Sequence, residues 1–254
     1  MPLLLGSEPF HHDGGPVGVL CCHGLSGTPA SMRPWAEHLA AAGFSVSAPR
    51  LPGHGTRWQD LNVTRWSDWY GEVVRSFDTL RTRCEQVFVA GLSMGGTLTI
   101  RLAEERGDEV AGIILVNPSL TTERRDAPLL RLLSHIVPSV PGIAGDVKKP
   151  GVREVAYDRL PLKAAASLAE LWPIARADLQ RVTQPVLLYR SRDDHVVEPV
   201  NGRILLDGVR SRDVTEHVLE DSYHVATIDN DAPAIFAGST AWIQEHADIS
   251  ADAS

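Results

Sequence analysis

The chain has 254 residues, of which 43% are hydrophobic, and a formal net charge of −8. This length and composition allow a sizeable buried core, as one large domain or two small ones. The acidic balance and the absence of any dense lysine and arginine run argue against a nucleic-acid partner.

The N-terminal stretch MPLLLGSEPFHHDGG has no basic segment and only three consecutive leucines, so it predicts neither a signal peptide nor a membrane span. We therefore expect a cytoplasmic protein. Cys21 and Cys22 are adjacent in an apolar run and Cys84 is distant. This spacing fits neither a disulfide framework nor a zinc site, so we expect buried, reduced thiols.

Apolar, often β-branched runs alternate with helical patterns along the chain. The runs lie at residues 17–22, 44–48, 87–91, 112–117, 185–190 and 215–220. Helical patterns include residues 31–43 and 231–247. Because most runs are apolar on both faces, the predicted fold class is α/β, with a mostly parallel central sheet and helices on both faces.

The long interval between Asn117 and Pro185 exceeds what a simple crossover helix needs. Residues 162–182 have a helical pattern returning to the sheet, with a bend expected at Pro173. Residues 119 to about 161 mix apolar side chains with prolines and charges, and we interpret them as a small cap over the sheet edge. The predicted organisation is one domain over residues 1–254 with this cap inserted.

The stretch VFVAGLSMGGTLTI places Ser93 where a predicted strand gives way to a predicted helix. Gly91 and Gly95 flank it in the pattern G-x-S-x-G, which allows a sharp turn that presents the serine hydroxyl at the sheet edge. Small residues at such a junction also serve a plain tight turn. Ser93 is therefore a candidate nucleophile that needs a base and an acid.

Candidate partners for Ser93 follow two later strands, where parallel sheets gather their sites. Asp193 and Asp194 come directly after the run at 185–190, and His224 follows the run at 215–220. The order Ser, Asp, His is that of hydrolases with a nucleophile elbow. We prefer Asp194 as the acid because it is the last carboxylate before the chain turns back toward a helix, and Asp193 stays the alternative.

Other histidines fit less well as the base. His38 and His246 lie on predicted helix surfaces, and the His-His-Asp stretch at 11–13 lies on a predicted N-terminal arm.

The negative oxygen of a tetrahedral intermediate needs preorganised donors. The backbone N–H of Met94, at the start of the helix after Ser93, is one candidate, since the helix dipole also favours negative charge there. The N–H of Leu25, in the loop HGLSGTP after the first predicted strand, is the other. This loop lacks the ending of a phosphate-binding loop.

The motifs HGLSGTP, RLPGHGT, GLSMGG, SRDDHVV and SYHVATID resemble those of the bacterial monoacylglycerol lipase and carboxylesterase group of the α/β-hydrolase superfamily. They span residues 23–229 in the expected order. The resemblance implies the α/β-hydrolase fold, with Ser93, Asp194 and His224 as catalytic residues and Leu25 and Met94 as oxyanion donors. It also implies a cap over the acyl pocket.

The predicted function is cleavage of carboxylic esters, above all monoacylglycerols, through an acyl-enzyme intermediate. No cofactor, metal or nucleotide is expected, and the expected partner is a small-molecule acyl ester. Two alternatives stay open, because the motifs describe acyl transfer rather than the leaving group. One gives the same residues a thioester, lactone or amide substrate, and the other is a ligand-binding protein on a hydrolase scaffold.

The predicted cap carries many apolar side chains, which either pack it onto the sheet or line an acyl tunnel. A transient contact of the cap with a lipid surface is also open. These side chains are Leu129, Leu130, Leu132, Leu133, Ile136, Val137, Val140 and Ile143. Farther along, Glu154 is the acidic residue best placed to bind glycerol hydroxyls, with a surface salt bridge as the alternative.

Overall fold

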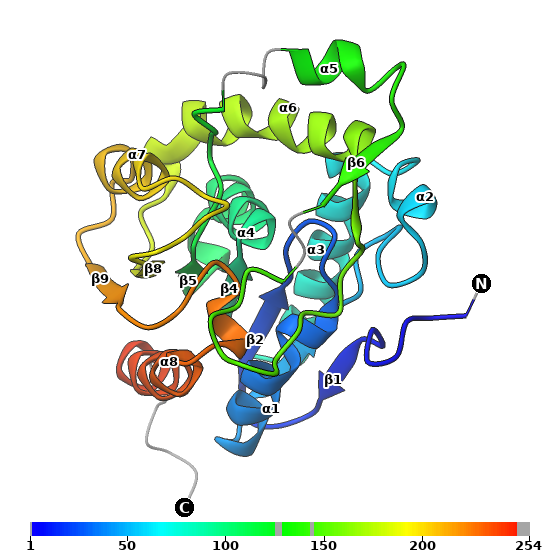
Figure 1. The fold of residues 1–254 in the computed structure, drawn as a ribbon. Coiled ribbons are helices and arrows are strands. Elements are labelled where there is room, and N and C mark those ends of the chain that lie inside the picture. The colour runs from blue at the N-terminus through cyan, green and yellow to red at the C-terminus, as the bar shows by residue number, and fades with distance from the viewer. Residues whose placement is uncertain (1, 125–128, 143–144, 248–254) are drawn as a thin grey trace, which may run out of the picture.

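Seven strands of the described chain form one sheet in the order β1-β3-β2-β4-β5-β8-β9 (Figure 1). The computed structural model describes residues 2–124, 129–142 and 145–247. The strands pair in parallel except β1, which pairs antiparallel with β3 at the edge. They are β1 (Phe10–His12), β2 (Val17–Cys22), β3 (Ser45–Ala48), β4 (Gln86–Leu92), β5 (Gly112–Val116), β8 (Val186–Ser191) and β9 (Val214–Leu219).

Helices cover both faces of this sheet (Figure 1). A hydrophobic core lies on each face of the sheet, and successive side chains of β4 point alternately into the two cores. Val87 and Val89 belong to one core, and Phe88 and Ala90 belong to the other. The first core also contains side chains of α3, α4, α6 and α7, and the second contains those of α1 and α8. The helices are α1 (Arg33–Ala41), α2 (Trp58–Leu61), α3 (Trp66–Arg81), α4 (Met94–Arg106), α5 (Leu130–Leu133), α6 (Leu162–Asp178), α7 (Val200–Gly208) and α8 (Ala232–His246).

The predicted parallel sheet is confirmed, and each predicted strand lies within two residues of an observed one. The expected burial of the cysteines is also confirmed, since Cys21, Cys22 and Cys84 are free and buried. The helix at 162–182 is confirmed as α6, which continues through Pro173.

Some elements were not predicted. Residues 11 and 12, which we expected on an N-terminal arm, belong to β1, and the His11 ring contacts the Ser47 hydroxyl. This strand has three residues and an exposed, polar face, so no alternating pattern indicates it. The sequence analysis also gave no element at α3, although its buried Trp69, Val73 and Phe77 lie at helical spacing.

Residues 119–161, for which we keep the name cap, contain α5 and a two-stranded antiparallel sheet in their described parts. This small sheet pairs β6 (Ser139–Pro141) with β7 (Arg159–Pro161). Figure 1 shows α5 above α6, and the two helices are in contact. Within the described ranges, no helix is long and apolar enough to cross a membrane.

Four apolar cap residues face outward. Leu129, Leu132, Leu133 and Ile136 are 54%, 64%, 40% and 76% exposed. They neither pack the cap onto the sheet nor line an enclosed tunnel, so both sequence interpretations are wrong for these four residues. Ile143, in the same predicted set, lies outside the described residues.

Candidate active site

Ser93 occupies a sharp turn between β4 and α4. Its backbone has φ 55° and ψ −118°, which side-chain-bearing residues rarely adopt and which costs about 1–3 kcal/mol. A Cβ on Gly91 would lie 2.4 Å from the Gly95 carbonyl oxygen, and one on Gly95 would lie 2.0 Å from the Cys22 carbonyl oxygen. The tight strand-to-helix turn expected from the sequence is therefore present, and its glycines are sterically required.

The loop after β2 lies against Ser93. A Cβ on Gly24 would be 3.4 Å from Ser93 Cβ and 3.9 Å from Ser93 Oγ. Leu25 follows Gly24 in this loop, and Met94 is the first residue of α4. One predicted donor residue thus follows the glycine that lies against Ser93, and the other follows Ser93 itself at the N-terminus of α4.

His23 fixes the shape of the same loop. Its Nε2 accepts a hydrogen bond from the Leu51 N–H at 3.2 Å, and its Nδ1 lies 3.0 Å from the Gly24 carbonyl oxygen. Burial lowers the pKa of His23 to about 4. The ring is therefore neutral at neutral pH and acts as a structural bridge between two loops.

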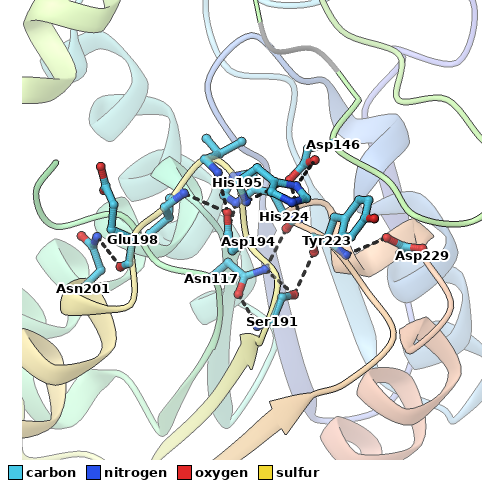
Figure 2. A network of polar contacts seen from close by, with 12 residues as sticks. Asn117, Asp146, Ser191, Asp194, His195, Glu198, Asn201, Tyr223, His224 and Asp229 are labelled. Atoms are coloured by element: carbon cyan, nitrogen blue, oxygen red, sulfur yellow. Dashed lines mark hydrogen bonds and ion pairs between the residues drawn. The ribbon is translucent and has the colours of Figure 1, made fainter. Parts of the chain in front are cut away.

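His224 and Asp194 form a buried pair (Figure 2). His224 Nδ1 lies 2.8 Å from Asp194 Oδ2, and the two side chains are 9% and 5% exposed. The other oxygen, Asp194 Oδ1, accepts the N–H groups of Val196 and Val197, each at 2.8 Å. Asp193 is exposed. Of the two candidate acids, Asp194 is the one that the structure places against the imidazole.

In this pair, each charged group stabilises the charged form of the other. Burial would raise the pKa of Asp194, but the His224 ring and the two backbone N–H groups hold that pKa below its usual value. Burial would lower the pKa of His224, but the nearby carboxylates, Asp194 foremost, raise it above its usual value. Because Nδ1 is bound to Asp194, Nε2 is the ring nitrogen that can accept a proton.

Asn117, directly after β5, links the loops that carry the pair (Figure 2). Its amide donates to the His224 carbonyl oxygen at 2.8 Å and to the Ser191 hydroxyl at 3.0 Å, and its Oδ1 accepts the Ser191 N–H at 2.8 Å. Its φ of 45° is again in the left-handed region. The preceding residue, Val116, accepts the Ser93 N–H at 3.0 Å, so this strand end contacts Ser93, the His224 loop and the end of β8 that leads to Asp194.

Glu154 extends from the cap into the same region. Its Oε1 is so near Gly27 that a Cβ there would lie only 2.6 Å from it, and its Oε2 accepts the Gly145 N–H at 3.4 Å. Burial raises the pKa of Glu154, and its charge in turn raises the pKa of His224. The alternative of a surface salt bridge is not what the structure contains, since no cation pairs with Glu154 among the described residues.

The other candidate histidines lie elsewhere. His38 is exposed on α1 and packs beside Phe236, and His246 Nε2 lies 2.9 Å from Asp213, which directly precedes β9. Among the residues that the structure describes, no group of histidine, cysteine and acidic side chains could hold a metal ion.

The sequence analysis missed residues that organise the site. Asn117 was placed at a strand end without a role, although an asparagine directly after a buried strand is a signal for a left-handed residue. Asp146, in the cap, contacts the loops of Asp194 and His224 (Figure 2). Asp146 is 49 residues from His195 and 78 residues from His224 along the chain, and no local sequence pattern indicates contacts over such separations.

The chain matches the family described as serine aminopeptidase, S33, over residues 17–231. A thermostable monoacylglycerol lipase of Bacillus sp. (strain H-257) is 42% identical over 250 residues, which cover 97% of this chain and 98% of that protein. A carboxylesterase of Bacillus subtilis (strain 168) is 24% identical over 227 residues, covering 88% of this chain and 91% of that protein.

Solved structures agree with these matches. A metagenome-derived lipolytic enzyme superposes with a TM-score of 0.94 at 40% identity, covering 96% of this chain and all (100%) of that chain. A monoacylglycerol lipase of Paleococcus ferrophilus superposes with a TM-score of 0.79 at 23% identity, covering 97% of this chain and 100% of that one. The second likeness concerns the fold alone.

Proposed function

This chain belongs to the serine aminopeptidase S33 family and is a carboxylic ester hydrolase of the α/β-hydrolase fold; we propose that it hydrolyses monoacylglycerols, with Ser93, Asp194 and His224 as its catalytic residues. The observation that carries the proposal is the buried His224–Asp194 pair, which Asn117 joins to the strand end that accepts the N–H of Ser93. The 42% identity to a bacterial monoacylglycerol lipase supports the substrate class.

In the proposed reaction, Ser93 Oγ attacks the ester carbonyl carbon while His224 Nε2 takes the hydroxyl proton. The carbonyl π electrons move onto oxygen, where the N–H groups of Leu25 and Met94 stabilise the charge. The bond to glycerol then breaks, and His224 returns the proton to the departing oxygen. A water molecule, deprotonated by His224, then attacks the acyl carbon. The bond between that carbon and Ser93 Oγ breaks, His224 returns the proton to Oγ, and the fatty acid is released.

Asp194 has two roles in this proposal. Its hydrogen bond to Nδ1 keeps the proton on that nitrogen, so Nε2 is free to act as the base. Its charge also stabilises the imidazolium that forms during each proton transfer. The Val196 and Val197 N–H groups hold the carboxylate ionised and in place.

Glu154 is proposed to accept hydrogen bonds from the glycerol hydroxyls. It lies against Gly27, two residues beyond Leu25, and its charge acts on His224. Among the described residues its one backbone contact is long, so its oxygens retain acceptor capacity for a polyol. A hydroxyl-bearing leaving group would therefore gain contacts that a simple alkyl ester lacks.

We also propose a transient contact between α5 and a lipid surface, because insoluble monoacylglycerols form such surfaces. The outward Leu132 and Ile136 supply apolar contact area on the cap. Beside them, Arg65, Arg131 and Lys163 line a cavity of about 370 Å³, and their charges suit anionic lipid headgroups.

Replacement of Ser93 by alanine tests the proposal, with Ser67→Ala on the exposed face of α3 as the matched control. Ser93→Ala should fold normally and lose at least about 10³-fold in kcat on a monoacylglycerol, whereas the control should keep full activity. Retention by Ser93→Ala of more than about a twentieth of the activity would refute the assignment of the nucleophile. A substrate panel of monoacylglycerols, thioesters, lactones and amides decides the leaving group, and a preference for any of the last three would refute the proposed substrate.

A further inference from the structure

Asp146 belongs to the cap, but its carboxylate reaches the two loops that carry Asp194 and His224 (Figure 2). Oδ2 accepts the backbone N–H of His224 at 3.1 Å and that of His195 at 3.3 Å. Oδ1 lies 2.8 Å from His195 Nδ1. One side chain, which is only 11% exposed, therefore joins the residue after Asp194 to the backbone of His224.

A second set of contacts fixes the cap segment that contains Asp146. The Asp146 carbonyl oxygen accepts the Val225 N–H at 3.1 Å. The Asp229 carboxylate accepts the N–H groups of Lys148 and Lys149 at 2.7 and 2.8 Å, and that of Tyr223 at 2.9 Å. The cap segment is thus bound to the His224 loop at Asp146 and again at Lys148 and Lys149, so the Asp146 carboxylate is held in place before any substrate binds.

The charge of Asp146 also acts on the imidazole. Three carboxylates face His224: Asp194 from the loop after β8, and Glu154 and Asp146 from the cap. Burial opposes them, yet together they raise the pKa of His224. His195, the cation-forming group that contacts Asp146, is exposed, and its own pKa is raised by the hydrogen bond and charge of Asp146.

We propose that Asp146 is a positioning residue for hydrolysis. From the cap, it fixes the positions of the Asp194 and His224 loops relative to each other and keeps a negative charge beside His224. The inference rests on the proposed function of Ser93, Asp194 and His224. Without Asp146, the backbone N–H groups of His195 and His224 lose their shared acceptor and the two loops lose their direct link. The His224 ring would then be free to shift relative to Asp194 and Ser93.

Two substitutions separate geometry from charge. In Asp146→Asn, the amide oxygen can still accept both backbone N–H groups and the amide nitrogen can donate to His195 Nδ1, so the links stay while the charge is lost. Asp146→Ala removes both. Asp158→Asn is the matched control, because Asp158 is an exposed cap carboxylate. His195→Gln is the second control, because it removes the imidazole and keeps Asp146.

The measurements are kcat, KM and the pH profile of kcat/KM on a soluble ester, with thermal unfolding of each variant. For Asp146→Ala we expect kcat to fall on the order of 10- to 100-fold with KM nearly unchanged, since small misplacements of reacting groups have effects of this size. For Asp146→Asn we expect most of kcat to remain. Its acid limb should move to lower pH, because loss of a negative charge lowers the pKa of His224. Asp158→Asn should keep the wild-type limb, and His195→Gln should not move the limb to lower pH, because it removes no negative charge.

A purely structural role would lower the unfolding temperature of the Asp146 variants but leave kcat per folded molecule and the acid limb unchanged. That result, or an equal limb shift in Asp158→Asn, would overturn the inference. If Asp146→Ala does not fold, the limb of Asp146→Asn decides alone. Failure of the proposed function gives a different result from failure of this inference. If the proposed function is wrong, Ser93→Ala stays active. If only the role of Asp146 is wrong, Ser93→Ala is inactive and the Asp146 variants behave like the wild type.

Discussion

The sheet and the cap contribute to the site in different ways. The sheet positions Ser93 through backbone geometry, with a strand that is buried from Val87 to Leu92, two sterically required glycines and a strained residue between them. The cap reaches the site through side chains, such as Glu154 against Gly27 and Asp146 on two loops. Changes in the sheet should therefore abolish the site, and changes in the cap should adjust its rate or specificity.

The largest effect is expected at the elbow glycine. A valine at position 95 would place its Cβ 2.0 Å from the Cys22 carbonyl oxygen, and this backbone cannot yield without separating α4 from β2. We expect a loss of more than about 4 kcal/mol in the free energy of unfolding, measured by urea denaturation, or no folded protein. Gly71→Ala is the control, since its nearest neighbour is 3.8 Å away. A Gly95→Val protein with normal stability and full activity would mean that the turn is not tight.

The next effect separates the two adjacent acids after β8. Asp194→Asn keeps the shape of the side chain but loses the charge that supports the imidazolium, so kcat should fall on the order of 10⁴-fold by analogy with serine proteases. Asp193→Asn should change kcat little, because Asp193 is exposed. Steady-state kinetics on one soluble ester compare the two. The reverse pattern would assign the acid to Asp193.

A smaller effect, confined to one class of substrate, is expected from the cap. Glu154→Ala should weaken kcat/KM for a monoacylglycerol by about 1–3 kcal/mol more than for the ethyl ester with the same acyl chain. The reason is that the glycerol hydroxyls lose an acceptor, whereas the ethyl ester has none to lose. Both esters are compared on the pH plateau, because the same substitution lowers the pKa of His224. An equal effect on both esters, or no effect on either, would remove Glu154 from the substrate site.

The smallest effect is expected on the outer surface of the cap. A double variant with aspartate at Leu132 and Ile136 should keep wild-type kcat/KM on a soluble ester, since both side chains face outward. On vesicles that contain monoacylglycerol, its rate and its co-sedimentation should drop several-fold. Leu5→Asp is the control, because Leu5 is 92% exposed and lies outside the cap. Equal losses in the control, or no loss on vesicles, would rule out a specific contact through α5.

The difference between the sheet and the cap also explains which features can be predicted from the sequence. Runs such as VFVAG are buried on both faces of the sheet, so composition alone indicates them, and the glycines around Ser93 mark a turn that only local geometry dictates. Position along the chain also favoured Asp194 over Asp193. The β6–β7 pair and the contacts of Asp146 depend on residues distant in sequence, and no local spacing reveals such pairings. The exposure of Leu129, Leu132, Leu133 and Ile136 was not predicted, because the number of apolar side chains does not distinguish a buried face from an exposed one.

The most direct test of the account is covalent labelling with a fluorophosphonate, followed by intact and peptide mass spectrometry and by monoacylglycerol hydrolysis on the same samples. The account predicts one adduct per chain, on the peptide that contains Ser93, with residual activity falling in proportion to labelling and no adduct in Ser93→Ala. Labelling at another residue, or a fully labelled Ser93 with hydrolysis intact, would contradict it.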